Sequence, residues 1–270
     1  MRPPWTLALA LAVSTLTGTT LAQSAAPAAP APWEGALGLV VRHSPNYLGA
    51  SSGAWHVNPG LFLRYGRFSV TTNSGFATRH NDEVERGVAA ELVRTDRLLL
   101  RLSARLDGGR DAGVDPALTG LPDLRATVRA RLSAVQLLGS GWRVSAGLSP
   151  DLLGRGGGIT ADAGITHEAR VAPGVVASVG LAATWADRRY HQSYFGITPA
   201  QSLSSGLRVY TPAAGLRDLG LSAGLRIDLG PHWIAFAGAG ASRLQGPALD
   251  SPLTRRRDNW STNGGLAWRF

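Results

Sequence analysis

The chain of 270 residues is long enough for one large domain or two small ones, and its formal net charge at neutral pH is +9. It contains no cysteine, which excludes disulfides, thiolate nucleophiles and Cys-ligated metals. Only 17% of its residues are charged whereas 34 are glycine, and this combination favours a β-barrel over a soluble α/β enzyme.

All of the positive charge is arginine, because the sequence contains no lysine. The arginines are spread along the chain, and the only run is Arg255-Arg256-Arg257. A nucleic-acid-binding surface needs a clustered basic patch, so we predict no nucleic-acid partner.

The N-terminal segment has the features of a secretory leader. Arg2 precedes an apolar stretch over residues 5–16, and Thr20-Leu21-Ala22 offers a small-x-small cleavage site before Gln23. The apolar stretch is too short to cross a membrane as a helix, and an uncleaved N-terminal anchor is the alternative. The chain is therefore divided into a signal peptide (1–22), an Ala/Pro-rich periplasmic tether (23–32) and a β-barrel (33–270).

From residue 33 onward the hydrophobic pattern has a period of two. Between residues 97 and 107, for example, leucines alternate with Arg101, Ser103 and Arg105. A helix would spread these arginines around its circumference, whereas a strand places them on one side. Each segment has about the 9–11 residues that a tilted strand needs to cross a bilayer, or a little more. Strands are expected near 33–43, 56–65, 67–75, 84–94, 97–107, 124–138, 142–153, 158–169, 174–186, 216–229, 232–243 and 259–270.

The connections between these strands alternate in length. Tight turns are expected at residues 65–67, 95–97, 139–141, 172–174 and 230–232, and longer loops at 44–55, 76–83, 108–123, 187–215 and 244–258. Only the connection at residues 154–157 departs from the alternation, because it is short. Short periplasmic turns and longer extracellular loops are typical of outer-membrane barrels.

The two faces of the strands differ in a way that favours lipid outside. A soluble β-sandwich or lipocalin-like barrel also alternates, but it has an apolar interior and a charged exterior. Here the apolar face carries almost no charge, and six tryptophans lie near strand ends, as an interfacial belt requires: Trp33, Trp142, Trp185, Trp233, Trp260 and Trp268. We therefore predict a single antiparallel outer-membrane β-barrel of about twelve strands.

The polar face is predicted to line the lumen. Its arginines need water or carboxylate partners there, and acidic residues at positions 85, 91, 107, 168 and 228 can supply some of them. If the lumen is open, fixed positive charges favour anions; if it is filled by these side chains, it is a plug, and the sequence leaves both open. The predicted lumen-lining residues are Arg101, Arg105, Arg125, Arg129, Arg131 and Arg226.

The last expected strand ends on outward-facing aromatic residues. Trp268 and Phe270 lie on its apolar face. This arrangement resembles the C-terminal signal that the barrel-assembly machinery reads in outer-membrane proteins, so we expect both residues to act in assembly.

The segment 184–218 resembles the signature stretch of the MipA/OmpV family. The specific part is Tyr194-Phe195-Gly196, followed by Gln201-Ser202, Ser205-Gly206 and Gly215-Leu216. Three further segments are similar, namely 44–50, 118–123 and 250–253, although Ala50 stands where the family usually has serine. The resemblance covers about residues 33–270.

This resemblance implies an outer-membrane barrel, and it carries over no catalytic residue or cofactor to this chain. The name-giving member is a scaffold that binds a lytic transglycosylase and a bifunctional peptidoglycan synthase, and other members are discussed as osmotic-stress proteins, adhesins or immunogens. The long loop at 187–215 is expected to pack on or into the barrel.

The sequence gives only weak indications of a phosphate-binding, catalytic or metal site. Residues 154–158 are glycine-rich, but they lack the Gly-Lys-Ser/Thr ending of a phosphate loop. Asp187, His191 and Ser193 lie close in sequence, but adjacent positions on an extended chain point in different directions. Residues 82–85 include three carboxylates, which more often form a solvated loop, and the six histidines lack metal-site spacing. We therefore predict no catalytic, cofactor or metal site.

Three functions follow from these patterns. The first is a non-enzymatic structural or scaffolding protein for cell-envelope machinery. The second is a narrow, anion-leaning diffusion pore, and the third is an outer-membrane hydrolase. The expected partners are outer-membrane lipid and lipopolysaccharide, the barrel-assembly machinery and a murein hydrolase or synthase.

Overall fold

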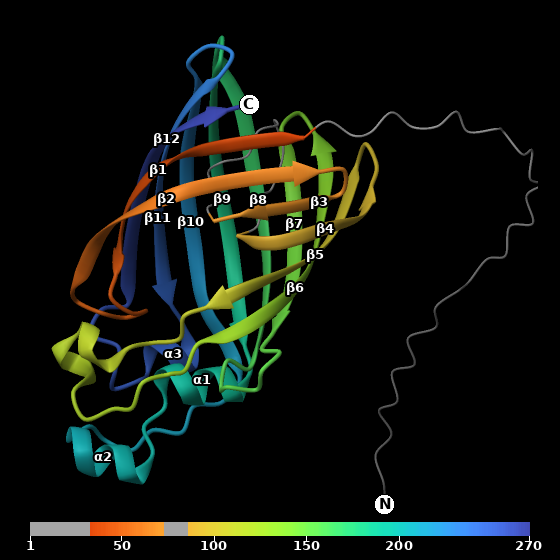
Figure 1. Cartoon of the computed structure of the whole chain (residues 1–270). Coiled ribbons are helices and arrows are strands. Elements are labelled where there is room, and N and C mark those ends of the chain that lie inside the picture. Colours follow the sequence, from red (N-terminus) through yellow and green to blue (C-terminus); the bar gives the residue numbers. More distant parts are fainter. Residues whose placement is uncertain (1–32, 73–85) are drawn as a thin grey trace, which may run out of the picture. The chain divides into compact units, whose positions relative to one another are not determined.

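The computed structural model describes residues 33–72 and 86–270. In this part, twelve antiparallel strands close into one barrel, in which each strand pairs with its sequence neighbours and β1 pairs with β12 (Figure 1). The predicted fold class is confirmed. The predicted signal peptide and tether, and the carboxylates of residues 82–85, lie outside the described residues.

The strand boundaries agree with the alternating pattern to within a few residues at most positions. Among the departures, β3 ends at Thr71 instead of residue 75, and β6 begins at Thr127 instead of residue 124, because Leu124 forms an isolated bridge with Arg110. The strands are β1 (Glu34–Pro45), β2 (Gly53–Tyr65), β3 (Phe68–Thr71), β4 (Gly87–Arg94), β5 (Leu98–Asp107), β6 (Thr127–Gly139), β7 (Trp142–Pro150), β8 (Ile159–Ala172), β9 (Val175–Ala186), β10 (Gly215–Asp228), β11 (Trp233–Leu244) and β12 (Asp258–Arg269).

The two ends of the barrel differ. One end, the turn end, carries the short connections together with the first residue of β1 and the last of β12. The other, the loop end, carries the longer connections and all helices of the described chain (Figure 1). None of these helices is long and apolar enough to cross a membrane. They are η2 (Ala112–Val114), η3 (Pro116–Leu118), α1 (Arg188–Phe195), α2 (Pro199–Ser205) and α3 (Gly246–Leu249).

The outer face of the barrel is apolar and exposed. Leu106, Leu181 and Leu221 are 71%, 59% and 51% exposed, which lipid rather than water would accommodate. Exposed aromatic residues lie at both ends of the strands, as predicted for an interfacial belt. Those at the turn end are Trp33, Tyr65, Phe68, Trp142, Trp233, Trp268 and Phe270, and those at the loop end are Trp55, Trp185 and Trp260.

The first and last strands close the sheet through close backbone contact. Gly35 and Phe270 exchange two backbone hydrogen bonds of 3.1 and 3.0 Å, and the pairing continues from Ala36–Arg269 onward. A Cβ at Gly38 would lie 2.1 Å from the carbonyl oxygen of Leu266, so only glycine permits this approach. Within residues 33–72 and 86–270, every strand thus has a neighbouring strand on both sides, whereas hydrocarbon does not tolerate an open sheet edge.

Candidate functional site

A buried arginine on β6 has hydrogen-bond partners for all three of its guanidinium nitrogens. The Arg129 side chain is 2% exposed, and its Nε donates to Asp107 Oδ2 at 2.7 Å. Its Nη1 donates to the carbonyl of Ser149 at 3.2 Å, and its Nη2 donates to the carbonyl of Gly157. A buried guanidinium is stable only when its donors have such partners.

The other inner-wall arginines on the strands are also largely paired with carboxylates. Glu91, Asp107, Glu168 and Asp228 had been expected as partners, and each forms an ion pair. Glu34 and Asp162 had not been expected. The other pairs include Arg64–Glu34 at 3.6 Å, Arg101–Glu91 at 3.4 Å, Arg131–Asp162, Arg143–Glu168 at 2.8 Å, Arg217–Asp218, Arg226–Asp228 at 3.3 Å and Arg269–Asp228 at 3.4 Å.

Apolar side chains occupy the turn end of the inner wall. Strand alternation directs them inward, since their sequence neighbours on the outer face are exposed. Ala36, Phe62 and Ala267 form one packed cluster there. Each member of the layer is at most 8% exposed, so this end of the lumen admits little water: Ala36, Phe62, Leu99, Val135, Val176, Ile234 and Ala267.

Helix α1 lies across the loop end and is anchored to the inner wall. The Tyr190 ring contacts two guanidinium groups, Arg129 at 5.5 Å and Arg217 at 5.3 Å, and its hydroxyl accepts a hydrogen bond of 2.9 Å from Arg217 Nη1. The Tyr194 ring stacks on Tyr190 at 4.5 Å. Phe195 is 1% exposed and belongs to a buried cluster with residues of β9, β11 and α3.

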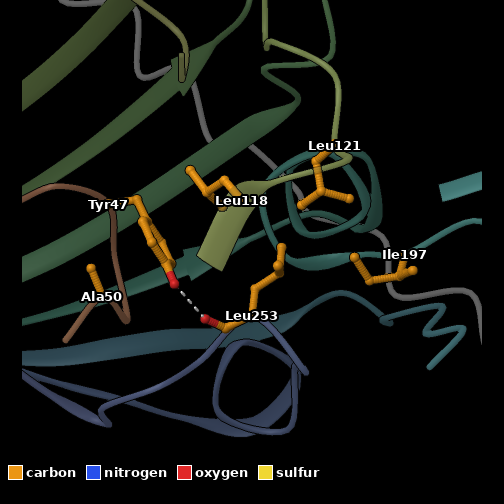
Figure 2. Close-up of a cluster of buried hydrophobic side chains, with 6 residues drawn as sticks. All are labelled: Tyr47, Ala50, Leu118, Leu121, Ile197 and Leu253. Atoms are coloured by element: carbon orange, nitrogen blue, oxygen red, sulfur yellow. Dashed lines mark hydrogen bonds between the residues drawn. The ribbon is translucent and has the colours of Figure 1, made fainter. Parts of the chain in front are cut away.

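A second hydrophobic cluster ties the long connections together. Figure 2 shows its residues, which come from the segments before β2, before β6, after α1 and before β12. Tyr47 also donates a hydrogen bond of 3.0 Å from its hydroxyl to the carbonyl of Leu253. The cluster consists of Tyr47, Ala50, Leu118, Leu121, Ile197 and Leu253.

The four segments that carry the family resemblance therefore meet in one place. Residues 44–50, 118–123 and 250–253 each contribute to this cluster, and the segment that begins at Tyr194 contributes Ile197. We call the connections that join here, residues 46–52, 108–126, 187–214 and 245–257, the loop-end cap. The segments that resemble the family therefore pack together into one structural unit.

The remaining residues of the long-loop motif form and end its helices. The N–H of Gly196 bonds to the carbonyls of His191 and Gln192 and ends α1. Gln201 completes a capping box with Thr198 at the start of α2. Ser205 Oγ donates to the carbonyl of Gln201 at 2.6 Å, and Gly206 ends α2 with a φ of 72°.

Among residues 33–72 and 86–270, two of the predicted lumen-lining residues, Arg125 and Arg105, do not form the ion pairs that the other four form. Arg125 lies in the segment before β6 and is exposed, so it is not part of the inner wall of the strands, contrary to the prediction. The cause is the late start of β6. Arg105 faces inward from β5, and within the described residues it has no hydrogen bond or ion pair.

The residues considered for hydrolysis have separate partners. His191 is fully buried with Nδ1 2.8 Å from the carbonyl of Ala213, and burial lowers its pKa. The Asp187 carboxylate accepts the N–H of Tyr190 at 2.7 Å. Ser193 faces the glycine-rich connection, since a Cβ on Gly156 would lie 2.7 Å from its Oγ. These contacts do not form a nucleophile–base–acid chain.

A cavity of about 600 Å³ lies between the loop-end cap and the inner wall. Its lining includes Arg42 and Arg105 from the strands and Arg110 from the cap, whereas Asp107 is its one carboxylate and is bonded to Arg129. Arg110 Nη1 donates to the carbonyl of Tyr194 at 2.9 Å. Arg42 resembles Arg105 in having no hydrogen bond or ion pair among residues 33–72 and 86–270.

Sequence reasoning missed several residues of this cavity. Arg42 follows the exposed Leu39 and Val41 on β1, so alternation alone could have placed it inside. No sequence pattern of this kind marks Tyr190 and Arg217, because their contacts depend on how α1 crosses the barrel. In the described part of the chain, no three His, Asp or Glu side chains gather as metal ligands would.

Comparison with known proteins places these features in a family. The family described as MltA-interacting protein MipA matches residues 37–270. YiaT of Escherichia coli (strain K12), which is named provisionally as an outer membrane protein, is 27% identical over 128 residues, or 47% of this chain and 51% of that protein. YiaT of Escherichia coli O157:H7 gives the same values. The chain thus spans about half the length of the curated relatives it matches.

The solved barrel structures share less sequence identity with this chain than these relatives do. The CymD monoaromatic hydrocarbon channel has 10% identity and a TM-score of 0.40, covering 89% of this chain and 88% of its own. OmpT of Vibrio cholerae has 7% identity and a TM-score of 0.36, covering 88% of this chain and 97% of its own. These likenesses are too distant to bear on function.

Proposed function

We propose that this chain, which belongs to the MltA-interacting protein MipA family, is a non-enzymatic scaffold of the outer membrane for peptidoglycan machinery. The observation that carries the proposal is the filled inner wall. Ion pairs line the wall of the lumen, an apolar layer occupies its turn end, and the loop-end cap packs over the other end. A barrel closed in this way at its turn end offers its surfaces, rather than a continuous channel, for interaction with a periplasmic partner.

The surface suited to a periplasmic partner is the turn end. A groove of about 700 Å³ lies there between the β4–β5 and β6–β7 turns. It carries Asp96, Arg97 and Arg143 together with backbone groups of the glycine-rich turn at residues 139–141, so its character is polar and mixed in charge. The family description names MltA as the interacting protein. We take MltA as the expected murein hydrolase and assign it to this groove, with the predicted tether 23–32 as a second contact.

The test is co-purification of the full-length protein with a lytic transglycosylase and a peptidoglycan synthase. We expect Arg97→Glu to weaken capture, whereas Arg208→Glu, at the loop end, leaves it unchanged. Equal capture by both variants argues against the groove, and no capture by the native protein argues against the scaffold.

A narrow anion-leaning pore is the second candidate, because Arg42 and Arg105 are uncompensated in the described lumen. Planar-bilayer recording of the purified protein separates the two functions. The scaffold predicts no steady current. A steady anion-selective current that Arg105→Gln reduces would replace the scaffold by the pore.

Export and insertion belong to the same proposal. Residues 1–22 act as a leader, so the protein in the outer membrane begins at Gln23, which N-terminal sequencing tests. The barrel-assembly machinery inserts the chain, and lipopolysaccharide surrounds its loop end.

A further inference from the structure

We infer that the cavity beneath the loop-end cap is a binding site for a small hydroxylated solute that carries a carboxylate or phosphate group. The site does not depend on the proposed scaffold role. At about 600 Å³ the cavity has the size of ordinary small-molecule sites, which commonly measure about 300–1,000 Å³.

The positive charge of the cavity is the first argument. The inner-wall arginines deeper in the barrel have carboxylate partners, which neutralise them. Arg42 and Arg105 are exposed to the cavity and have no such partner among the described residues. Two guanidinium groups that project into one cavity favour an oxyanion, because each can donate two parallel hydrogen bonds to it.

The neutral groups of the lining are the second argument. Hydroxyl and amide side chains border the cavity, among them Ser44, Asn46 and Ser242. Tyr194 borders it as well, and burial together with the nearby Asp107 raises the pKa of its hydroxyl to about 12. That hydroxyl therefore stays protonated at neutral pH. Such groups hydrogen-bond a hydroxylated body next to the anionic group.

The closed turn end of the lumen is the third argument. Phe62 and Ala267 belong to the apolar cluster at the turn end, and Tyr194 and Phe195 border the cavity from the cap. A solute that enters at the loop end is held in a pocket and has no direct way through the barrel. The geometry thus indicates binding rather than passage.

The experiment is isothermal titration calorimetry on the folded, full-length protein in detergent. Glucose 6-phosphate and glucuronate are the anionic probes, glucose is the neutral control, and inorganic phosphate tests whether the anion alone is sufficient. We expect both anionic sugars to bind, glucose to bind much more weakly and added salt to reduce the affinity. No binding of either anionic sugar, or equal binding of glucose, would overturn the inference.

Two variants connect the binding to the cavity. Arg42→Gln and Arg105→Gln should each weaken binding about tenfold or more, since each removes a charge-assisted hydrogen-bond donor. The control Arg243→Gln removes an arginine that pairs with Asp258 on the outer face, and it should bind like the native protein. Heat-modifiable gel migration verifies that every variant is folded. Unchanged affinity in the Arg42 and Arg105 variants contradicts the site.

The chain itself offers a competing anion. Asp82, Glu83 and Glu85 lie outside the described residues, and their carboxylates are candidates for the same arginines. A variant with Asp82→Asn, Glu83→Gln and Glu85→Gln distinguishes the two cases. Binding by the native protein supports the inference, whereas binding by this variant alone would overturn it.

Discussion

At the scale of single residues, Arg129 connects the barrel wall to the cap. Its guanidinium bonds to Asp107 on β5, to carbonyls on both sides of the β7–β8 connection and, through its face, to the Tyr190 ring of α1. Removing one partner of a buried pair costs far more than the pair contributes, because the other charge remains unpaired. This residue therefore stabilises the wall and the cap together.

Arg129→Met should lower the free energy of unfolding by about 3 kcal/mol, because Asp107 and two carbonyls lose their donor. Urea titration of the protein in lipid vesicles measures the change. The matched control Arg243→Met removes an exposed pair and should change the free energy of unfolding far less. The double change Arg129→Met with Asp107→Leu should recover part of the loss. Equal effects of the two single changes would contradict the role of burial.

His191 makes the cap sensitive to acid. Burial lowers its pKa below 6.5, because the charged ring would have to form without water. A base with a lowered pKa stabilises the folded state at pH values above its unfolded pKa, and this contribution is lost as the pH falls through the folded pKa. Hydrogen exchange of the α1 amides, corrected for intrinsic rates, should accordingly lose protection as the pH falls below the ordinary histidine pKa of about 6.5. His191→Gln should remove this dependence, and a dependence that survives the change would exclude His191 as its source.

At the scale of elements, β12 joins the two ends of the sheet. Its last aromatic residues face outward, with the rings of Trp268 and Phe270 5.3 Å apart. A Cβ on Gly35 would lie 2.4 Å from the Phe270 ring, so β1 has room for this ring only because glycine stands opposite. The same strand end combines closure of the barrel with an exposed aromatic surface.

Phe270→Ser should reduce the amount of folded barrel in the outer membrane several-fold while changing refolding in detergent little. The ring is 51% exposed, so its removal should cost the folded barrel little, whereas it would remove the predicted assembly signal. Heat-modifiable migration of membrane fractions and of refolded protein measures both quantities. Trp260→Ser, at the other end of β12, is the control and should assemble normally. A similar loss in both variants would point to membrane anchoring rather than to an assembly signal.

At the scale of the whole molecule, the polarity of the barrel is the reverse of that of a soluble protein: the outer face is apolar and the inner face is polar. Neighbouring positions on β10 test this directly. Leu221 faces outward near the middle of the strand, and Ser222 faces the lumen. Leu221→Arg should lower the free energy of unfolding in lipid vesicles by about 2–4 kcal/mol, whereas Ser222→Arg should cost much less. Equal costs, measured by urea titration, would contradict a lipid-facing exterior.

Twelve strands, their alternation and the turn–loop asymmetry could be predicted from the sequence. These features are local, because each strand shows its two faces within about ten residues and each turn shows its glycines directly. The prediction failed where a local pattern extended past the true strand end. Arg125 continues the alternation of β6, but the bridge between Leu124 and Arg110 ends the pairing first.

The sequence by itself determined which side of the sheet meets lipid, because partition of leucine and arginine between hydrocarbon and water depends on the residue alone. Only the tertiary structure decided which charges pair and where the cap packs. Arg131 forms an ion pair with Asp162, which lies 31 positions further along the chain. Tyr47 forms a hydrogen bond with Leu253, which lies 206 positions further along. Those contacts depend on closure of the barrel, which brings distant strands and loops to the same height, and no local pattern records that geometry.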